Sequence, residues 1–167
     1  MHTGLYVMMG VSGAGKSLIG ARFAAELDIE FVEGDTLHSP DNVKKMTAGI
    51  GLTDDDRHAW LLRIAARLRE AQRAGVGLIV ACSALKRSYR DLLRSHGAAD
   101  VRFVYLAGGR ALLAERLAQR RGHFMPQSLL DSQLATLEAP SPDEHAWVCD
   151  IGETPDMIVA ALVTRSA

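Results

Sequence analysis

The feature that most constrains the fold is a run of eight residues, Gly10 to Ser17, with the spacing GxxxxGKS. An apolar stretch, Leu5–Met9, precedes it, and a helical pattern with apolar residues four apart follows it. Between a buried strand and a helix N-terminus, the glycines of such a loop let backbone N–H groups approach phosphate oxygens without side-chain clash. The sequence therefore predicts a strand–loop–helix unit that binds nucleotide phosphates.

The residue types of this loop suggest a division of roles. We expect the side chain of Lys16 to reach the β- and γ-phosphates of ATP, and the hydroxyl of Ser17 to coordinate Mg²⁺. A glycine-rich turn without function is the alternative, and the flanking strand and helix patterns argue against it. The expected nucleotide-binding residues are Gly10, Val11, Ser12, Gly13, Ala14, Gly15, Lys16, Ser17 and Leu18.

Four further apolar runs resemble Leu5–Met9, and they cover residues 31–33, 78–82, 101–106 and 147–151. None alternates polar with apolar residues, which is typical of parallel strands buried on both faces. Helical patterns lie between them, over residues 39–46, 53–71, 86–94, 111–120 and 156–164. The alternation predicts an α/β fold, a three-layer sandwich of helices around a parallel sheet, in a single domain over residues 1–167.

Two of these helices carry recognisable start signals. Ser39 is followed by Pro40, which is typical of an N-cap and a first-turn proline. Thr53 is followed three residues later by Asp56, a capping-box pattern with Asp in place of the usual Glu.

Composition narrows the class of protein. The net charge of −1 gives no electrostatic reason to expect nucleic acid or an anionic membrane as a partner. Cys82 and Cys149 lie in apolar runs, so we expect buried, reduced thiols rather than a disulfide framework. Leu5–Met9 is too short to cross a bilayer and leads directly into the glycine loop. We therefore expect a cytoplasmic protein.

GTPase switches, one class of P-loop protein, can be set aside because their motifs are missing. The DxxG and NKxD segments of GTPase switches do not occur in the sequence. The remaining expectation is a small P-loop kinase that phosphorylates a metabolite or a nucleotide.

Further sequence blocks carry a specific resemblance. In chain order they are residues 9–17, 33–38, 52–57 with Trp60-Leu61, 82–86, 89–94 and 120–124. In combination these blocks resemble the gluconokinase family over nearly the whole chain. The resemblance implies transfer of the ATP γ-phosphoryl group to the 6-hydroxyl of D-gluconate. It also implies an adenylate- or shikimate-kinase-like fold with a five-stranded parallel sheet, a mobile lid over approximately residues 117–135, and a homodimer.

Asp35 is the expected catalytic carboxylate. It follows the second predicted strand, and open α/β sheets present ligands at the carboxyl ends of their strands. There it could orient the acceptor hydroxyl, accept its proton late and support the water shell of Mg²⁺. The alternative is a turn aspartate that caps local N–H groups. His38 could donate a hydrogen bond to a sugar hydroxyl, with an exposed loop histidine as its alternative.

The acidic run Asp54–Asp56 has two interpretations. Acidic residues in the first turn of a helix favour the helix dipole and cap free N–H groups. The family resemblance instead implies sugar contacts from Asp54 and from Arg57, whose fork could pair with the gluconate carboxylate. Lys45 is also an expected substrate ligand, although a solvated lysine is the simpler interpretation.

Lys86, Tyr89 and Arg90 have the i, i+3, i+4 spacing that places side chains on one helix face. A cation, a phenol and a guanidinium together suit a polyhydroxy acid, so we expect all three to bind substrate. An ordinary salt-bridged helix surface is the alternative.

Arg116 and Arg120 lie one turn apart, just before Gly122-His123. The resemblance implies that Arg116 stacks on adenine, that Arg120 reaches the transferred phosphoryl group, and that His123 contacts substrate. An arginine that arrives on closure would neutralise developing charge and exclude water. A solvated basic helix end is the alternative.

The predicted strand over 78–82 ends in Cys82-Ser83, without the aspartate that holds Mg²⁺ in many NTPases. We therefore expect the metal on Ser17 and the phosphates, with Asp35 in its outer shell. Two rivals remain at this point: a shikimate or nucleoside kinase, and a nucleotide-binding regulator without transferase activity.

Overall fold

The computed structural model describes residues 1–120 and 127–167. Five parallel strands form one sheet in the order β2-β3-β1-β4-β5. The strands are β1 (Leu5–Met9), β2 (Glu30–Glu33), β3 (Leu78–Ala81), β4 (Arg102–Ala107) and β5 (Trp147–Asp150). The helices are α1 (Lys16–Leu27), α2 (Pro40–Thr47), α3 (Asp54–Ala74), α4 (Arg87–His96), α5 (Arg110–Ala118), α6 (Gln127–Thr136) and α7 (Pro155–Ser166), with 3₁₀ turns η1 (Gly34–Leu37) and η2 (Pro142–Glu144).

The central strand β1 explains why the apolar runs lack alternation. Leu5, Val7 and Met9 are buried in one hydrophobic cluster, together with residues of α3 and α4. Tyr6 and Met8 are buried in a second cluster on the opposite face, with residues of α1 and α7. Both faces of the strand are therefore covered, and every position favours an apolar residue.

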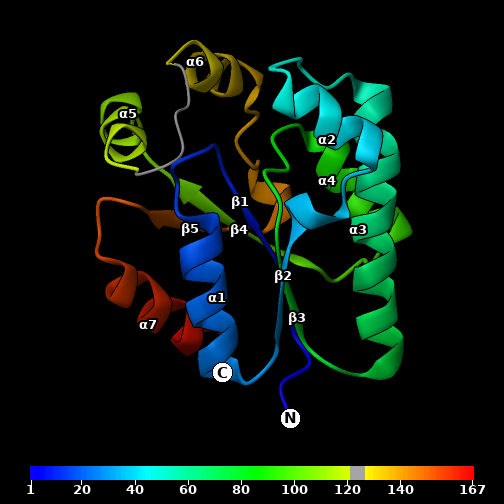
Figure 1. Ribbon diagram of the computed structural model, residues 1–167. Helices are drawn as coiled ribbons and strands as arrows, with labels where there is room; N and C mark the ends of the chain where they lie inside the picture. The colour runs from blue at the N-terminus through cyan, green and yellow to red at the C-terminus, as the bar shows by residue number, and fades with distance from the viewer. Residues whose placement is uncertain (121–126) are drawn as a thin grey trace.

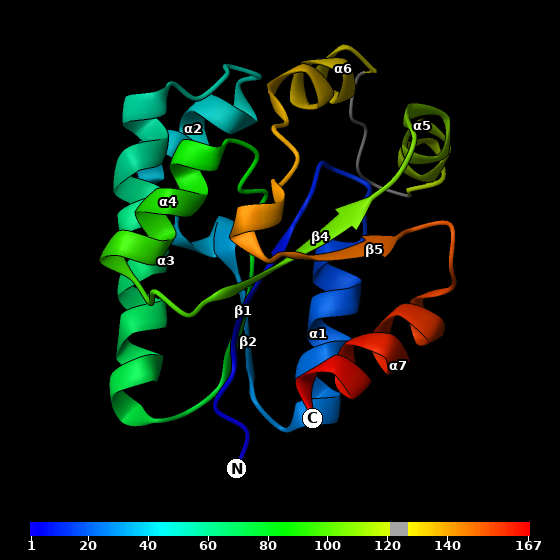
Figure 2. The ribbon, with the colours of Figure 1, turned by 180° about the vertical axis from the view of Figure 1, so that it is seen from behind.

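Figures 1 and 2 show the resulting layers. Helices α1 and α7 lie on one side of the sheet, and α3 and α4 lie on the other. Helices α2, α5 and α6 gather at the end of the molecule toward which the strands point. The carboxyl edge of the sheet is therefore surrounded by loops and short helices, the position where open α/β sheets bind ligands.

The predicted helix starts are confirmed. The Ser39 hydroxyl accepts a hydrogen bond from the backbone N–H of Asn42 at 3.1 Å. Thr53 and Asp56 form the full capping box, since the Thr53 hydroxyl accepts from the Asp56 N–H at 3.1 Å and the Asp56 carboxylate accepts from the Thr53 N–H at 2.9 Å. These caps fix where α2 and α3 begin, and with them the side chains in their first turns.

The α/β fold and the five-stranded parallel sheet are confirmed, and each predicted strand and helix has a counterpart near its expected bounds. Helix α6 has no counterpart among the helices that the sequence predicts; all its residues except Thr136 fall within the predicted lid segment, residues 117–135. Cys82 and Cys149 are buried free thiols, as expected. Within residues 1–120 and 127–167, no helix is long and apolar enough to cross a membrane.

Candidate functional site

The phosphate loop has the backbone geometry that its sequence predicts. Gly10, Gly13 and Gly15 adopt positive φ angles of 147°, 85° and 95°. A side chain at Gly13 would also meet Leu117, since a Cβ there would lie 3.0 Å from the Leu117 Cγ. The loop is tied to the neighbouring strand by a hydrogen bond from the Gly10 N–H to the Ser83 carbonyl, at 3.2 Å. Glycine is therefore required by both backbone angle and close packing.

Lys16 begins α1 and curls back over this loop. Its Nζ donates to the Val11 carbonyl at 3.1 Å. Burial lowers the pKa of Lys16, and the nearby negative charge of Asp35 opposes that shift. A partly desolvated ammonium group beside a carboxylate is well placed to attract a phosphate anion, because its charge is weakly screened there.

Ser17 and Glu33 form a contact that the sequence interpretation did not include. The Ser17 hydroxyl, in the first turn of α1, donates to a carboxylate oxygen of Glu33 at the end of β2. Asp35 lies two residues farther along, in η1. A hydroxyl with two carboxylates provides hard oxygen donors of the kind that Mg²⁺ prefers.

A cavity of about 400 Å³ opens at this edge of the sheet. Its lining brings phosphate-loop residues together with residues from β2 and η1, α3 and α6. Among the sequence-predicted residues, the cavity is lined by Ser12, Lys16, Asp35, His38 and Arg57. Residues that the sequence interpretation did not assign to the site also line it, among them Glu33, Trp60, Ser83, Leu129 and Gln133. The two predicted halves of the site therefore share one space.

His38 is held on one wall of the cavity by stacking. Its ring lies parallel to the Trp60 indole, with 4.2 Å between ring centroids and an angle of 15°. The Trp60 Nε1 donates to the Gly34 carbonyl at 2.8 Å, which fixes the indole beneath η1. Burial lowers the pKa of His38, which favours the neutral imidazole. Trp60 thus packs in the core, as its position on the apolar stripe predicts, and also orients a cavity residue.

Asp54, Lys86 and Tyr89 form a polar cluster beside the cavity. The Tyr89 hydroxyl donates to Asp54 Oδ1 at 2.6 Å, and the Lys86 Nζ approaches the same oxygen at 3.3 Å. Hydrogen bonds from Tyr89 and Lys86 lower the pKa of Asp54. Arg57 joins the cluster, because its Nη1 donates to the Tyr89 hydroxyl at 3.3 Å. The structure therefore brings together four of the predicted substrate residues, from α3 and from the start of α4.

Lys45 and Asp56 pair with each other. The Lys45 Nζ donates to both carboxylate oxygens of Asp56, at 3.0 and 2.9 Å. Asn42, buried in α2, donates to the Asp56 carbonyl at 2.9 Å. These contacts hold α2 against the start of α3, and Lys45 does not line the cavity within the described residues.

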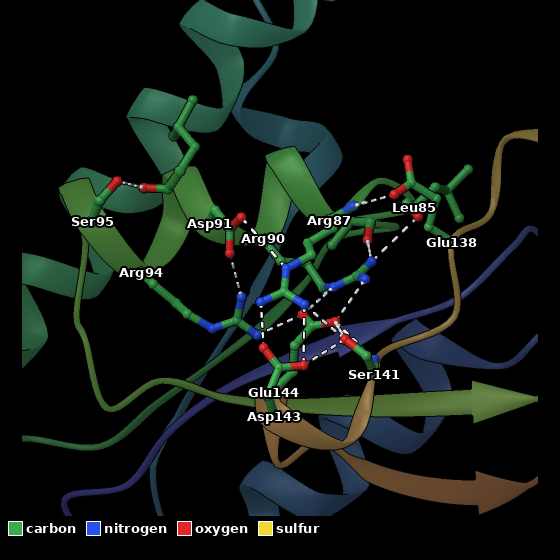
Figure 3. A network of polar contacts seen from close by, with 12 residues as sticks. Leu85, Arg87, Arg90, Asp91, Arg94, Ser95, Glu138, Ser141, Asp143 and Glu144 are labelled. Carbon is green, nitrogen blue, oxygen red and sulfur yellow. Dashed lines mark hydrogen bonds and ion pairs between the residues drawn. The ribbon is translucent and has the colours of Figure 1, made fainter.

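For Arg90 the structure favours the salt-bridge alternative over direct contact with substrate. Its side chain is 0% exposed and forms a two-pronged ion pair with Glu144, with Nε–Oε1 and Nη2–Oε2 distances of 2.8 and 3.0 Å. Figure 3 shows the two side chains facing each other, with Arg94 on the other side of Glu144. Lys86 is the N-cap of α4, and the Arg90 N–H donates to its carbonyl at 3.3 Å, but the Lys86 side chain reaches Asp54 whereas that of Arg90 reaches Glu144.

Arg116 lies in the last turn of α5, and Arg120 follows that helix. A guanidinium nitrogen of Arg116 donates to the Ile151 carbonyl, which ties α5 to the turn after β5. Arg120 is exposed, and its positive charge is a minor cause of the lowered pKa of Lys16, after burial. Leu18 is half exposed in the first turn of α1. His123 lies outside the described residues.

Gln133 is the most informative residue that sequence reasoning missed. Its side chain extends from α6 to the phosphate loop, where Oε1 accepts a hydrogen bond from the Ser12 N–H at 2.7 Å. No local pattern marks a glutamine 121 positions away as a partner of this loop. Glu33, by contrast, belongs to the block at residues 33–38 and could have been assigned with Asp35.

Within the described residues there is no group of three or more His, Cys, Asp or Glu side chains that could hold a metal ion. A metal held entirely by such protein ligands is therefore not indicated in this part of the chain. The donors at Ser17, Glu33 and Asp35 instead suit a cation that arrives with a phosphate ligand.

Comparison with known proteins places these features in a family. A family model described as an AAA domain matches residues 5–140. The gluconokinase of Gluconobacter oxydans (strain 621H) is 47% identical over 157 residues, which cover 94% of this chain and 88% of that protein. The thermoresistant gluconokinase of Escherichia coli (strain K12) is 40% identical over 160 residues, covering 95% of this chain and 91% of that protein.

Solved structures give the same result. The crystal structure of a gluconokinase from Sinorhizobium meliloti 1021 matches with a TM-score of 0.89 and 45% identity, over 99% of this chain and 92% of that one. A shikimate kinase from Aquifex aeolicus matches with a TM-score of 0.58 and 14% identity, over 96% of this chain and 94% of that one, and so shares the fold alone. Identity at this level over nearly the full length, together with the phosphate loop and the cavity beside it, shows that the chain belongs to the gluconokinase family.

Proposed function

We propose that this protein transfers the γ-phosphoryl group of ATP to the 6-hydroxyl of D-gluconate, giving 6-phospho-D-gluconate and ADP. The observation that carries the proposal is the shared cavity, in which Lys16 of the phosphate loop and Arg57 of α3 line one space with Asp35. A phosphate donor and an anionic, hydroxyl-rich acceptor could meet there. Family membership supports the choice of gluconate as that acceptor.

On the donor side, backbone N–H groups of the phosphate loop other than that of Gly10, which bonds to the Ser83 carbonyl, would bind the β- and γ-phosphates. Lys16 would neutralise charge on the transferred group, and Arg120 would approach it from the other side. Arg116 would border the adenine, beside the turn after β5 to which it is tied. Bound Mg²⁺ would supply electrostatic neutralisation of the phosphates, held by Ser17 with Glu33 and Asp35 nearby.

On the acceptor side, the carboxylate of gluconate would pair with Arg57, whose guanidinium offers a planar fork of donors. Lys86, Tyr89 and Asp54 would complete the recognition of hydroxyl groups near that end, and Lys45 and His123 remain proposed ligands. His38 would contact hydroxyls along the chain. Asp35 would orient the 6-hydroxyl toward the γ-phosphorus and accept its proton late in the transfer. Helix α6 and the neighbouring part of residues 117–135 would serve as the lid that excludes water.

An acceptor panel tests the proposal. Purified protein with ATP and Mg²⁺ is supplied in turn with gluconate, shikimate, a nucleoside monophosphate and no acceptor, and ADP release is followed. A second coupled assay with 6-phosphogluconate dehydrogenase identifies the product. We expect turnover with gluconate and a signal from the dehydrogenase. Turnover with another acceptor and none with gluconate would reject the proposal, and ATP binding without any transfer would indicate a nucleotide-binding regulator.

The family resemblance also supports a homodimer. Sedimentation equilibrium of the full chain checks this directly, and a mass of 18.1 kDa at micromolar concentration would contradict it.

A further inference from the structure

The segment between β3 and α4, residues 83–86, touches both halves of the candidate site. At its start, Ser83 lines the cavity and its carbonyl accepts the hydrogen bond from the Gly10 N–H of the phosphate loop. At its end, Lys86 reaches Asp54 in the polar cluster. A shift of this short segment would therefore move the donor and acceptor sides relative to each other.

The backbone of this segment is strained at Ala84. Its φ angle is +46°, in the left-handed region, and the residue is buried. For an L-residue other than glycine this conformation is energetically unfavourable. Such a conformation persists only where the surroundings hold it, and it is often found near functional sites.

The Arg90 guanidinium forms hydrogen bonds with this segment. Its Nη1 donates to the Ala84 carbonyl at 2.8 Å and to the Leu85 carbonyl at 3.3 Å. Its other edge is taken by Glu144 of η2, whose side chain is only 1% exposed. The Leu85 carbonyl also accepts from the Glu138 N–H at 2.8 Å, so the segment is tied to the chain between α6 and β5. Figure 3 shows Arg90 between Leu85 and Glu144.

A buried ion pair is a poor device for stability alone, because desolvating two charges offsets most of their attraction. Here the Nε, Nη1 and Nη2 atoms of Arg90 all donate hydrogen bonds. No buried side-chain nitrogen or oxygen among the described residues lacks a partner. Arg94 also donates to Glu144, at 2.7 Å, and holds the carboxylate from its more exposed side. The arrangement orients one guanidinium edge toward two backbone carbonyls.

We propose that Arg90 and Glu144 are positioning residues for phosphoryl transfer. They hold the Ser83–Lys86 segment, so that the phosphate loop and the polar cluster around Asp54 keep their relative positions. This inference rests on the proposed kinase function. It replaces the direct substrate contact predicted for Arg90 with an action through the backbone of a neighbouring segment.

The test compares two arginines that share one carboxylate. Arg90→Lys keeps the charge but loses the fork that reaches Ala84 and Leu85. Arg94→Lys, the matched control, weakens the same ion-pair network, and Arg94 donates no hydrogen bond to residues 83–86. Both are assayed for kcat and for the KM of ATP and of the acceptor, at a temperature well below their melting midpoints.

We expect Arg90→Lys to lose roughly ten- to a hundredfold in kcat, as misplacement at a distance from the reacting atoms can do. Arg94→Lys should stay within about twofold of the wild type, whatever its change in melting temperature. Equal losses in the two variants, or normal kcat in Arg90→Lys, would overturn the proposal. If Arg90→Lys does not fold, Glu144→Gln is compared with Arg94→Lys by the same criterion.

A rescue experiment separates positioning from general destabilisation. Ala84→Gly removes the backbone penalty that Arg90 has to hold, so it should restore part of the kcat of Arg90→Lys without restoring its melting temperature. No recovery of kcat in the double variant would overturn the proposal. Both comparisons are made with whichever acceptor the wild type uses, so a failed gluconate assay rejects the proposed function without affecting this test.

Discussion

The two sides of the candidate site are built by different means. The phosphate side is a continuous run of backbone, residues 10–17, whose donors are N–H groups positioned by three glycines with positive φ angles. The acceptor side is assembled from side chains of α3, of α4 and of Lys86 just before α4, which form hydrogen bonds with one another. A local, backbone-built site is specified by its own sequence, whereas a side-chain site depends on distant partners.

The largest effect is expected from a substitution where the phosphate and acceptor sides meet. Asp35→Asn keeps the size of the side chain and removes its negative charge. We expect kcat to fall by about 10²–10⁴-fold, the range for loss of a group that handles the acceptor proton. The dissociation constant of ATP, measured by calorimetry, should stay within a few-fold of wild type. A near-normal kcat would remove Asp35 from the mechanism.

On the phosphate side, Gly13→Ala should damage nucleotide binding specifically. The new Cβ would be strained at a φ of +85° and would meet Leu117. A penalty of roughly 1–2 kcal/mol for the backbone alone corresponds to about a five- to thirtyfold weaker ATP affinity. Gly75→Ala is the control, since Gly75 has a φ of +68° in open space at the end of α3. Equal losses of ATP affinity in both variants would show that the loop geometry is not responsible.

On the acceptor side, Arg57→Lys should raise the KM of gluconate by about tenfold and leave the KM of ATP unchanged. The lysine keeps a positive charge but cannot form the two-pronged contact with a carboxylate. Initial rates with each substrate varied in turn provide the measurement. An equal rise in both KM values would indicate that Arg57 supports the fold rather than the acceptor.

Gln133 of α6 contacts the phosphate loop, and its substitution should give a smaller effect of opposite sign. Its Oε1 occupies the Ser12 N–H, a donor that a phosphate oxygen would need. Gln133→Ala should therefore strengthen ATP binding by about two- to tenfold, the value of one net hydrogen bond. Gln127→Ala, at the exposed start of the same helix, serves as the control. Weaker ATP binding in Gln133→Ala would contradict this interpretation and indicate a direct phosphate ligand.

The smallest expected effect is a change in folding stability with pH. Burial alone would raise the pKa of Glu144, but hydrogen bonds from Arg90 and Arg94 outweigh it and lower the pKa to about 2, from an ordinary value of 4.5. The folded state therefore keeps the carboxylate charged after the unfolded chain has taken up a proton. The stability that this ionised carboxylate contributes is complete above about pH 4.5 and is lost as the pH falls toward 2.

Melting temperatures of the wild type and Glu144→Gln, measured from pH 7 to pH 2.5, check this expectation. The difference between the two proteins should be constant down to about pH 4.5 and should shrink below it. A difference that does not change with pH would mean that the Glu144 charge contributes no pH-dependent stability.

The contrast between local and distant contacts also explains which features could be predicted from the sequence. The strands, most helices, the phosphate loop and the capped starts of α2 and α3 follow from local patterns, and all have counterparts in the structure. Arg90 was assigned to the substrate because spacing alone does not reveal a partner such as Glu144, 54 residues away. Gln133 was missed for the same reason. Contacts across the fold depend on packing that no short motif contains.

A crystal structure with gluconate and a non-hydrolysable ATP analogue tests the central claim most directly, since it shows whether the two sides act on one reaction. We expect the triphosphate on backbone N–H groups within residues 11–17 and the gluconate carboxylate on Arg57. The 6-hydroxyl should lie within hydrogen-bond reach of Asp35 and face the γ-phosphorus. Gluconate bound outside this cavity, or with its 6-hydroxyl turned away from Asp35, would contradict the account.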